Sequence, residues 1–218
     1  MATTIHEPPS NSHSGDNGWG NLPPASRRLS VEDNSPASRT GIWVGLAAIT
    51  MTFAAFTSAL VVRQASSNDW VRFSLPPVLY ANTVLLLVSS MTLEIARRKF
   101  ARFTRHPSER RAAAPLFWLY VTLGLGLMFV IGQYMAWRQL KAAGLYLATT
   151  PSASFFYVLT AAHVLHVLGG LAGLLLVISR LRARVPTLRG STLNAVSYYW
   201  HFMDILWFYL LALLWLKL

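Results

Sequence analysis

The feature that most constrains the fold of this chain is a series of five apolar segments, each 21 to 26 residues long and nearly free of charge. At a rise of 1.5 Å per residue, helices of this length extend about 31–39 Å and can cross a hydrocarbon core roughly 30 Å thick. Only 12% of the residues are charged, too few for the solvated surface of a soluble domain. The sequence predicts an all-α fold, a polytopic membrane helix bundle with five transmembrane helices at about residues 41–62, 76–96, 115–137, 154–179 and 193–216.

Residues 1–39 differ in composition from the rest of the chain. They are rich in Ser, Pro, Asn and Gly and have few large apolar side chains, so they cannot bury enough surface to offset the entropy of ordering. We therefore predict a disordered polar tail at residues 1–39 and a transmembrane domain at residues 40–218.

The basic residues predict the orientation of the helices. Of the 19 Lys and Arg residues, 14 lie in the tail and in the loops after the second and fourth helices, and five lie on the other side. The positive-inside rule then places the N-terminus in the cytoplasm and the C-terminus outside, on the periplasmic side. The net charge of +11 is explained by loops that face anionic lipid, so we expect no nucleic-acid partner.

The chain has no cysteine, which limits the redox chemistry that it can hold. Disulfides, zinc–thiolate sites, iron–sulfur clusters and copper centres built on thiolates are all excluded.

Two ionisable residues, His201 and Asp204, lie near the middle of the fifth predicted helix. A charged group at the bilayer centre costs about 2.5–3.5 kcal/mol, so such groups are functional candidates. Their spacing of three places them on one face, flanked by Trp200 and Trp207. They could contact a neighbouring helix or subunit, form part of a proton route, or be a local pair that fixes packing. Trp200 is too deep for an interfacial anchor, and we interpret it as a packing residue.

His163 and His166 are also three residues apart, near the middle of the fourth predicted helix. Imidazole is the commonest metal ligand, so these two could bind a metal together with His201 and Asp204 or Glu94. Two histidines at this spacing on one helix cannot take opposite axial positions of one haem. Hydrogen-bonded histidines that serve packing are the alternative, and the absence of a His-Glu-x-x-His motif favours it.

Glu94 lies about one turn from the predicted cytoplasmic end of the second helix, close to Arg97 and Arg98. Arg98 follows at i+4, the order that favours an ion pair. Glu94 is therefore either a carboxylate that reaches the interface or a group that faces lipid or handles protons, and its spacing favours the first interpretation.

Motifs occur in four of the predicted helices, the second to the fifth. The fifth helix reads YYWHFMDILW at residues 198–207. The fourth reads FFYVLTAAHVLHV at residues 155–167, and the second reads NTVLLLVSSMTLE at residues 82–94. The third ends in GQYMAW at residues 132–137, which adds Gln133 to the candidate residues. Together these segments, which cover about residues 40–217, resemble subunit III of haem–copper terminal oxidases. They occur in that family's order, and the fifth is similar to its tyrosine-tryptophan-histidine-phenylalanine-valine-aspartate segment.

The resemblance implies the short five-helix bacterial form of this subunit, in the bacterial inner membrane. It implies partners, namely the haem–copper catalytic subunit I and subunit II, and phospholipids bound between the helices. Haems and copper are expected in the partner subunits, with no cofactor, metal or catalytic residue in this chain. Glu94, Gln133, His163, His166, Trp200, His201 and Asp204 are then structural, or related to proton uptake and lipid.

The implied activity belongs to the complex, which reduces oxygen to water and pumps protons with electrons from cytochrome c. A quinol oxidase has a very similar third subunit and stays open as an alternative, as does a stand-alone haem or metal membrane enzyme. Two positions depart from the family pattern. Met203 replaces the usual valine, and Ala136 occupies a position where a carboxylate is frequent.

Overall fold

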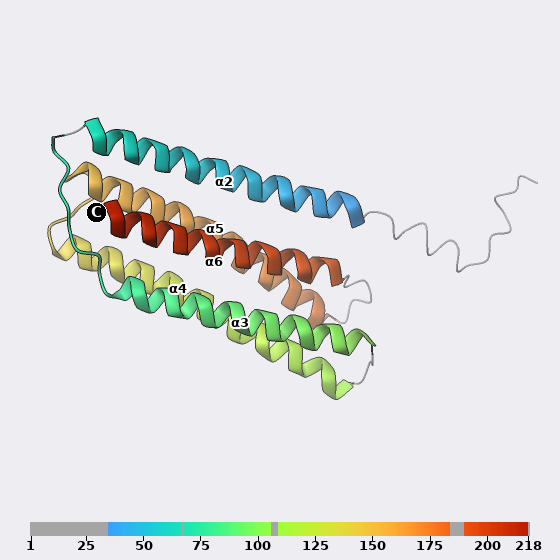
Figure 1. Ribbon diagram of the computed structural model, residues 1–218. Helices are drawn as coiled ribbons and strands as arrows, with labels where there is room; N and C mark the ends of the chain where they lie inside the picture. Colours follow the sequence, from blue (N-terminus) through green and yellow to red (C-terminus); the bar gives the residue numbers. More distant parts are fainter. Residues whose placement is uncertain (1–34, 67, 106–108, 184–189, 218) are drawn as a thin grey trace, which may run out of the picture. The chain divides into compact units, whose positions relative to one another are not determined.

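The computed structural model describes residues 35–66, 68–105, 109–183 and 190–217 and consists there of α-helices joined by loops (Figure 1). The helices are α2 (Ser35–Ser66), α3 (Val78–Arg105), α4 (Glu109–Ala142), α5 (Pro151–Arg182) and α6 (Gly190–Lys217). Each contains a stretch long and apolar enough to cross a membrane. The prediction of an all-α bundle with five membrane-spanning helices is thus confirmed.

All five helices are longer than the apolar segments that predicted them. α2 begins at Ser35 and therefore includes five residues assigned to the polar tail, whereas residues 1–34 of that predicted tail lie outside the described residues. α3 continues to Arg105 and α4 begins at Glu109 rather than at Pro115. These extensions are rich in Ala, Arg and Lys, which favour helix, so hydropathy marks the membrane-spanning part and not the helix end.

The start of α5 shows a local signal that hydropathy does not detect. Thr150 caps the helix, its hydroxyl accepting a hydrogen bond from the backbone N–H of Ala153 at 3.2 Å, and Pro151 occupies the first turn. A Thr cap followed by Pro is a favoured way to begin a helix, because the cap satisfies a free N–H and Pro needs none. The helix therefore begins at Pro151 instead of the predicted residue 154.

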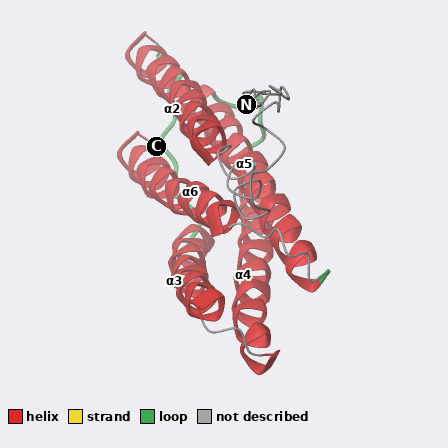
Figure 2. Cartoon of the chain, turned by 90° about the vertical axis from the view of Figure 1, so that its right-hand side faces the viewer, coloured by secondary structure: helices red, strands yellow, loops and turns green. Residues whose placement is uncertain are grey.

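Helices α3, α4, α5 and α6 form a closed arrangement in which each packs against two neighbours (Figure 2). The pairs in contact are α3 with α4, α4 with α5, α5 with α6 and α6 with α3. α2 joins this group through long side chains. The Phe53 ring lies 5.7 Å from the ring of His166 on α5, and Tyr209 on α6 donates a hydrogen bond to Thr57 at 2.8 Å.

The interior of the bundle is built around two tryptophans of α6. Trp200 and Trp207 are fully buried, and both indole N–H groups donate to hydroxyls of α3, to Ser89 at 3.1 Å and to Thr83 at 3.0 Å. Because the two tryptophans are seven residues apart, they lie two turns apart on one face. These bonds fix the register of α6 against α3.

Glycines let the large rings approach the helix backbones. A Cβ at Gly126 on α4 would lie 2.9 Å from the Trp200 ring, and one at Gly170 on α5 would lie 3.3 Å from it. Small residues at helix contacts are typical of membrane bundles, where close packing replaces the hydrophobic driving force. Trp200 thus occupies a space that depends on both glycines.

Candidate functional site

Polar side chains of α3 and α6 interact where these two helices pack together. Nδ1 of His201 on α6 is hydrogen-bonded to the hydroxyl of Ser90 on α3 at 2.6 Å. One turn further along α3, Glu94 accepts bonds from Arg97 at 2.8 Å and from Arg98 at 2.9 Å. The bond to Ser90 is a contact between His201 and a neighbouring helix, one of the alternatives that its position in the sequence left open.

Glu94 forms a partly exposed ion pair with the two arginines that follow it on α3. Its side chain is 25% exposed, and the side chains of Arg97 and Arg98 are 34% and 73% exposed. Partners at i+3 and i+4 reach the same carboxylate because both follow it on one helix face. Exposed pairs of this kind contribute only about 0–1 kcal/mol to stability.

Asp204 lies inside the bundle, on the face of α6 that turns toward α3. It is 6% exposed, and within the described helices neither carboxylate oxygen meets the geometry of a hydrogen bond, although the Ser90 side chain is close to it. Asp204 and His201 therefore share a face, as predicted, and they meet α3 at the same serine.

The three membrane histidines point in different directions. His163 packs inward, and its ring centroid lies 5.1 Å from that of Trp207 and 5.8 Å from that of Phe129. His166 faces α2, its Nδ1 hydrogen-bonded to the Ala162 carbonyl of its own helix at 2.7 Å. His201 points toward α3, where its Nδ1 is hydrogen-bonded to the Ser90 hydroxyl.

This divergence bears on the metal-enzyme alternative. In the part of the chain that the structure describes, no group of three or more His, Asp or Glu side chains could hold a metal ion. Because the imidazoles diverge, they do not fit the ligand set of a haem–copper centre.

Gln133 is the remaining candidate on α4. It is fully buried, and its amide nitrogen and oxygen have no hydrogen-bond partner in the described segments. The sequence predicted it as a candidate only through the family resemblance.

The hydroxyl groups of α3 were missed in the sequence analysis. Ser89 accepts a hydrogen bond from Trp200, Thr83 accepts one from Trp207, and Ser90 is hydrogen-bonded to His201. Thr92 is hydrogen-bonded to Thr122 of α4 at 2.8 Å. The signal was present in the sequence as small polar residues repeated through an otherwise apolar helix.

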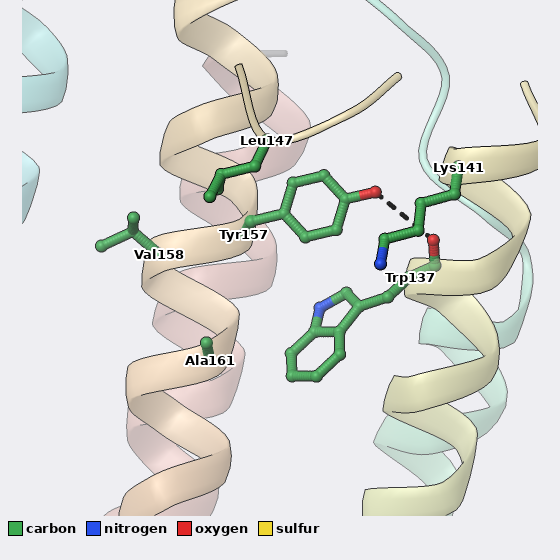
Figure 3. A pocket seen from close by; sticks show the side chains of 6 residues that line it. All are labelled: Trp137, Lys141, Leu147, Tyr157, Val158 and Ala161. Atoms are coloured by element: carbon green, nitrogen blue, oxygen red, sulfur yellow. Dashed lines mark hydrogen bonds between the residues drawn. The ribbon is translucent and has the colours of Figure 1, made fainter. Parts of the chain in front are cut away.

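A pocket of about 330 Å³ opens between the end of α4 and the start of α5 (Figure 3). Its lining is mostly apolar and aromatic, with one cationic side chain, and consists of Trp137, Lys141, Leu147, Tyr157, Val158 and Ala161. The Trp137 indole donates to Thr160 at 3.0 Å, and the Tyr157 hydroxyl donates to the Leu145 carbonyl at 2.9 Å. Both rings are therefore held in place.

Comparison with known protein families gives the same assignment as the motifs. The protein-family model described as "Cytochrome c oxidase subunit III" matches residues 44–217, which include all five membrane-spanning segments nearly in full. The chain belongs to this family.

Individual relatives carry names of two oxidase types. The chain is 35% identical over 96 residues to a probable cytochrome c oxidase subunit 3 of Nocardia farcinica, and 38% identical over 91 residues to one of Mycobacterium tuberculosis. These matches cover 44% and 41% of this chain and 47% and 45% of the relatives, so the chain spans about half the length of each. It is also 31% identical over 172 residues to the cytochrome bo(3) ubiquinol oxidase subunit 3 of Pseudomonas aeruginosa, covering 77% of this chain and 78% of that protein.

Proposed function

We propose that this chain is the non-catalytic third subunit of an aerobic respiratory oxidase that reduces oxygen to water and pumps protons. The observation that carries the proposal is the family match over residues 44–217, supported by motifs on four successive helices. The diverging histidines and the lack of cysteine support the proposal that the redox centres belong to partner chains, which would be subunits I and II. In this proposal the chain supports the stability and proton uptake of subunit I in a bacterial inner membrane.

The proposed orientation has the N-terminus in the cytoplasm and the C-terminus outside. The arginine-rich ends of α3 and α5 and the paired Glu94 then lie at the cytoplasmic surface. The Lys141 pocket, at the other end of α4, lies at the outer surface.

Purification of the chain in mild detergent tests the proposal. We expect it to co-purify with a haem- and copper-containing subunit, and we expect the separated chain to carry neither haem nor copper. Stoichiometric haem or metal on the isolated chain would overturn the subunit assignment and favour the stand-alone enzyme.

The same preparation identifies the electron donor. The Nocardia farcinica and Mycobacterium tuberculosis relatives are named probable cytochrome c oxidase subunits, which supports cytochrome c as the donor. The name of the Pseudomonas aeruginosa relative supports a quinol. We favour cytochrome c. A partner with two cysteines in a copper-binding pattern is the expected result, and its replacement by a partner without them would select the quinol oxidase.

Phospholipid is the second class of partner in the proposal. The pocket between α4 and α5 joins an apolar lining to the cationic Lys141 at a helix end, which suits an acyl chain below an anionic headgroup. Trp137 and Tyr157 are the residue types that favour this depth of the membrane.

Lys141→Gln is expected to lower the amount of phosphatidylglycerol retained by the purified complex, because the pocket loses its positive charge. Native mass spectrometry after exchange into phosphatidylglycerol or phosphatidylcholine vesicles measures this. Arg138→Gln is the matched control, since Arg138 lies one turn earlier on α4 and does not line the pocket. Equal retention in the two variants would contradict the lipid assignment.

A further inference from the structure

Unpaired polar atoms are buried where α4 meets α5. Gln133 of α4 and His163 of α5 are both fully buried, and none of the four side-chain nitrogen and oxygen atoms has a hydrogen-bond partner in the described helices. Nδ2 of the buried Asn82 on α3 also has none. Leaving one such group unpaired costs about 1–3 kcal/mol, so the unpaired atoms of these three residues need an explanation.

The helix register brings Gln133 and His163 to the same level. On α4, Gln133 lies one turn after Phe129 and one turn before Trp137, so the three share a face. The Phe129 ring contacts the His163 ring at 5.8 Å, and Trp137 donates to Thr160, one turn before His163. Gln133 lies between these two contacts along α4, on the same helix face and close to the level of His163.

Asn82 approaches the same place from α3. A Cβ on Gly132, the neighbour of Gln133, would lie 2.0 Å from Oδ1 of Asn82. The Asn82 side chain thus lies against the α4 backbone next to Gln133, and the absence of a side chain at Gly132 makes room for it. Buried amide groups of α3 and α4 thus lie near one another, close to the level of the His163 imidazole on α5.

We propose that Gln133, His163 and Asn82 share a buried water molecule. Water both donates and accepts, typically makes about three hydrogen bonds, and so matches a set of amide and imidazole groups that includes donors and acceptors. A cation is disfavoured because the three side chains carry no carboxylate, the ligand that hard cations prefer. The rings of Phe129 and Trp207 flank the imidazole, with centroids 5.8 and 5.1 Å from that of His163.

This water site is independent of the proposed function, because it depends only on contacts within the chain. It links α3, α4 and α5 at one point and would fix the orientation of His163.

A density map of the intact, unmodified complex, at a resolution that shows ordered water, tests the proposal directly. We expect density within hydrogen-bond distance of Gln133 and of His163 or Asn82. A direct bond between Gln133 and His163 with no density between them would overturn the proposal, as would density for an ion or an organic molecule.

A second test compares thermal unfolding of Gln133→Leu, His163→Leu and the double variant in the purified complex. If one water serves both residues, removing either leaves the other unpaired, and the second substitution costs less than the first. We expect the thermal midpoint of the double variant to lie about 2–4 °C or more above the midpoint calculated by adding the shifts of the two single variants.

The control pairs His163→Leu with Ser197→Ala. Ser197 is equally buried and its hydroxyl has no partner in the described region, but it lies ten residues before Trp207, about 15 Å along α6. Additive shifts are expected for this pair. Additive shifts for Gln133 and His163 as well would refute a shared water, and if the variants do not assemble, the map of the unmodified complex decides.

Discussion

Trp207→Ala is expected to lower the free energy of unfolding by on the order of 3 kcal/mol, in line with other buried aromatic truncations. Trp207 is 1% exposed, lies 5.0 Å from the Phe129 ring and donates a hydrogen bond to Thr83. In a membrane bundle the loss comes mainly from the cavity and from the Thr83 hydroxyl left without its donor, because lipid tails are as apolar as the interior. Thermal unfolding of the purified complex, with its yield, measures the change.

Trp215→Ala is the matched control, on the same helix and of the same residue type. The Trp215 side chain is 68% exposed within the chain, so its removal leaves no internal cavity. We expect a much smaller change for this variant. Equal losses for the two would show that Trp207 is not a packing centre.

The sequence predicted the number, type and approximate position of the helices because the bilayer imposes a length on every apolar segment. It did not predict the helix ends. At α3 and α4 the chain leaves the apolar region but keeps residues such as Ala and Arg, which continue a helix in water. At these places the apolar stretch and the helix therefore end at different residues.

The candidate site could be predicted only as far as single helices allow. The shared face of His201 and Asp204 follows from their spacing and from nothing else. The directions of His163 and His166 depend on which helices lie beside α5, and spacing on one helix cannot reveal that. Their neighbours, Trp207 and Phe53, come from the two ends of the chain.

Part of the contact between α3 and α6 was predictable from the spacing of residues in the sequence. Its hydroxyl residues Thr83 and Ser89 are nearly two turns apart, as are Trp207 and Trp200 on the antiparallel α6. Indole N–H groups buried in a membrane need acceptors, and hydroxyls at matching intervals on another helix can supply them. The pairing could be proposed from spacing alone, whereas the choice of α3 over other helices required the structure.

Gly126→Val is expected to destabilise the bundle by about 1–3 kcal/mol, the usual effect of added volume in a packed interior. Even the first added atom would lie 2.8 Å from Cδ2 of Leu171 and 2.9 Å from the ring of Trp200. Leu171 could change rotamer, but Trp200 is held by its bond to Ser89, so the helices must separate.

Gly124→Val is the control for this prediction, because a Cβ at Gly124 meets nothing within 4 Å although the residue lies on the same helix only two positions away. Both substitutions bring the same β-branched residue into α4, so their difference isolates the contact with α5 and α6 from helix propensity. We expect the thermal midpoint of the purified complex to fall for Gly126→Val and to change little for Gly124→Val. Equal shifts of the thermal midpoint for the two variants would contradict this prediction. They would mean that α4 does not approach Leu171 and Trp200 closely at Gly126.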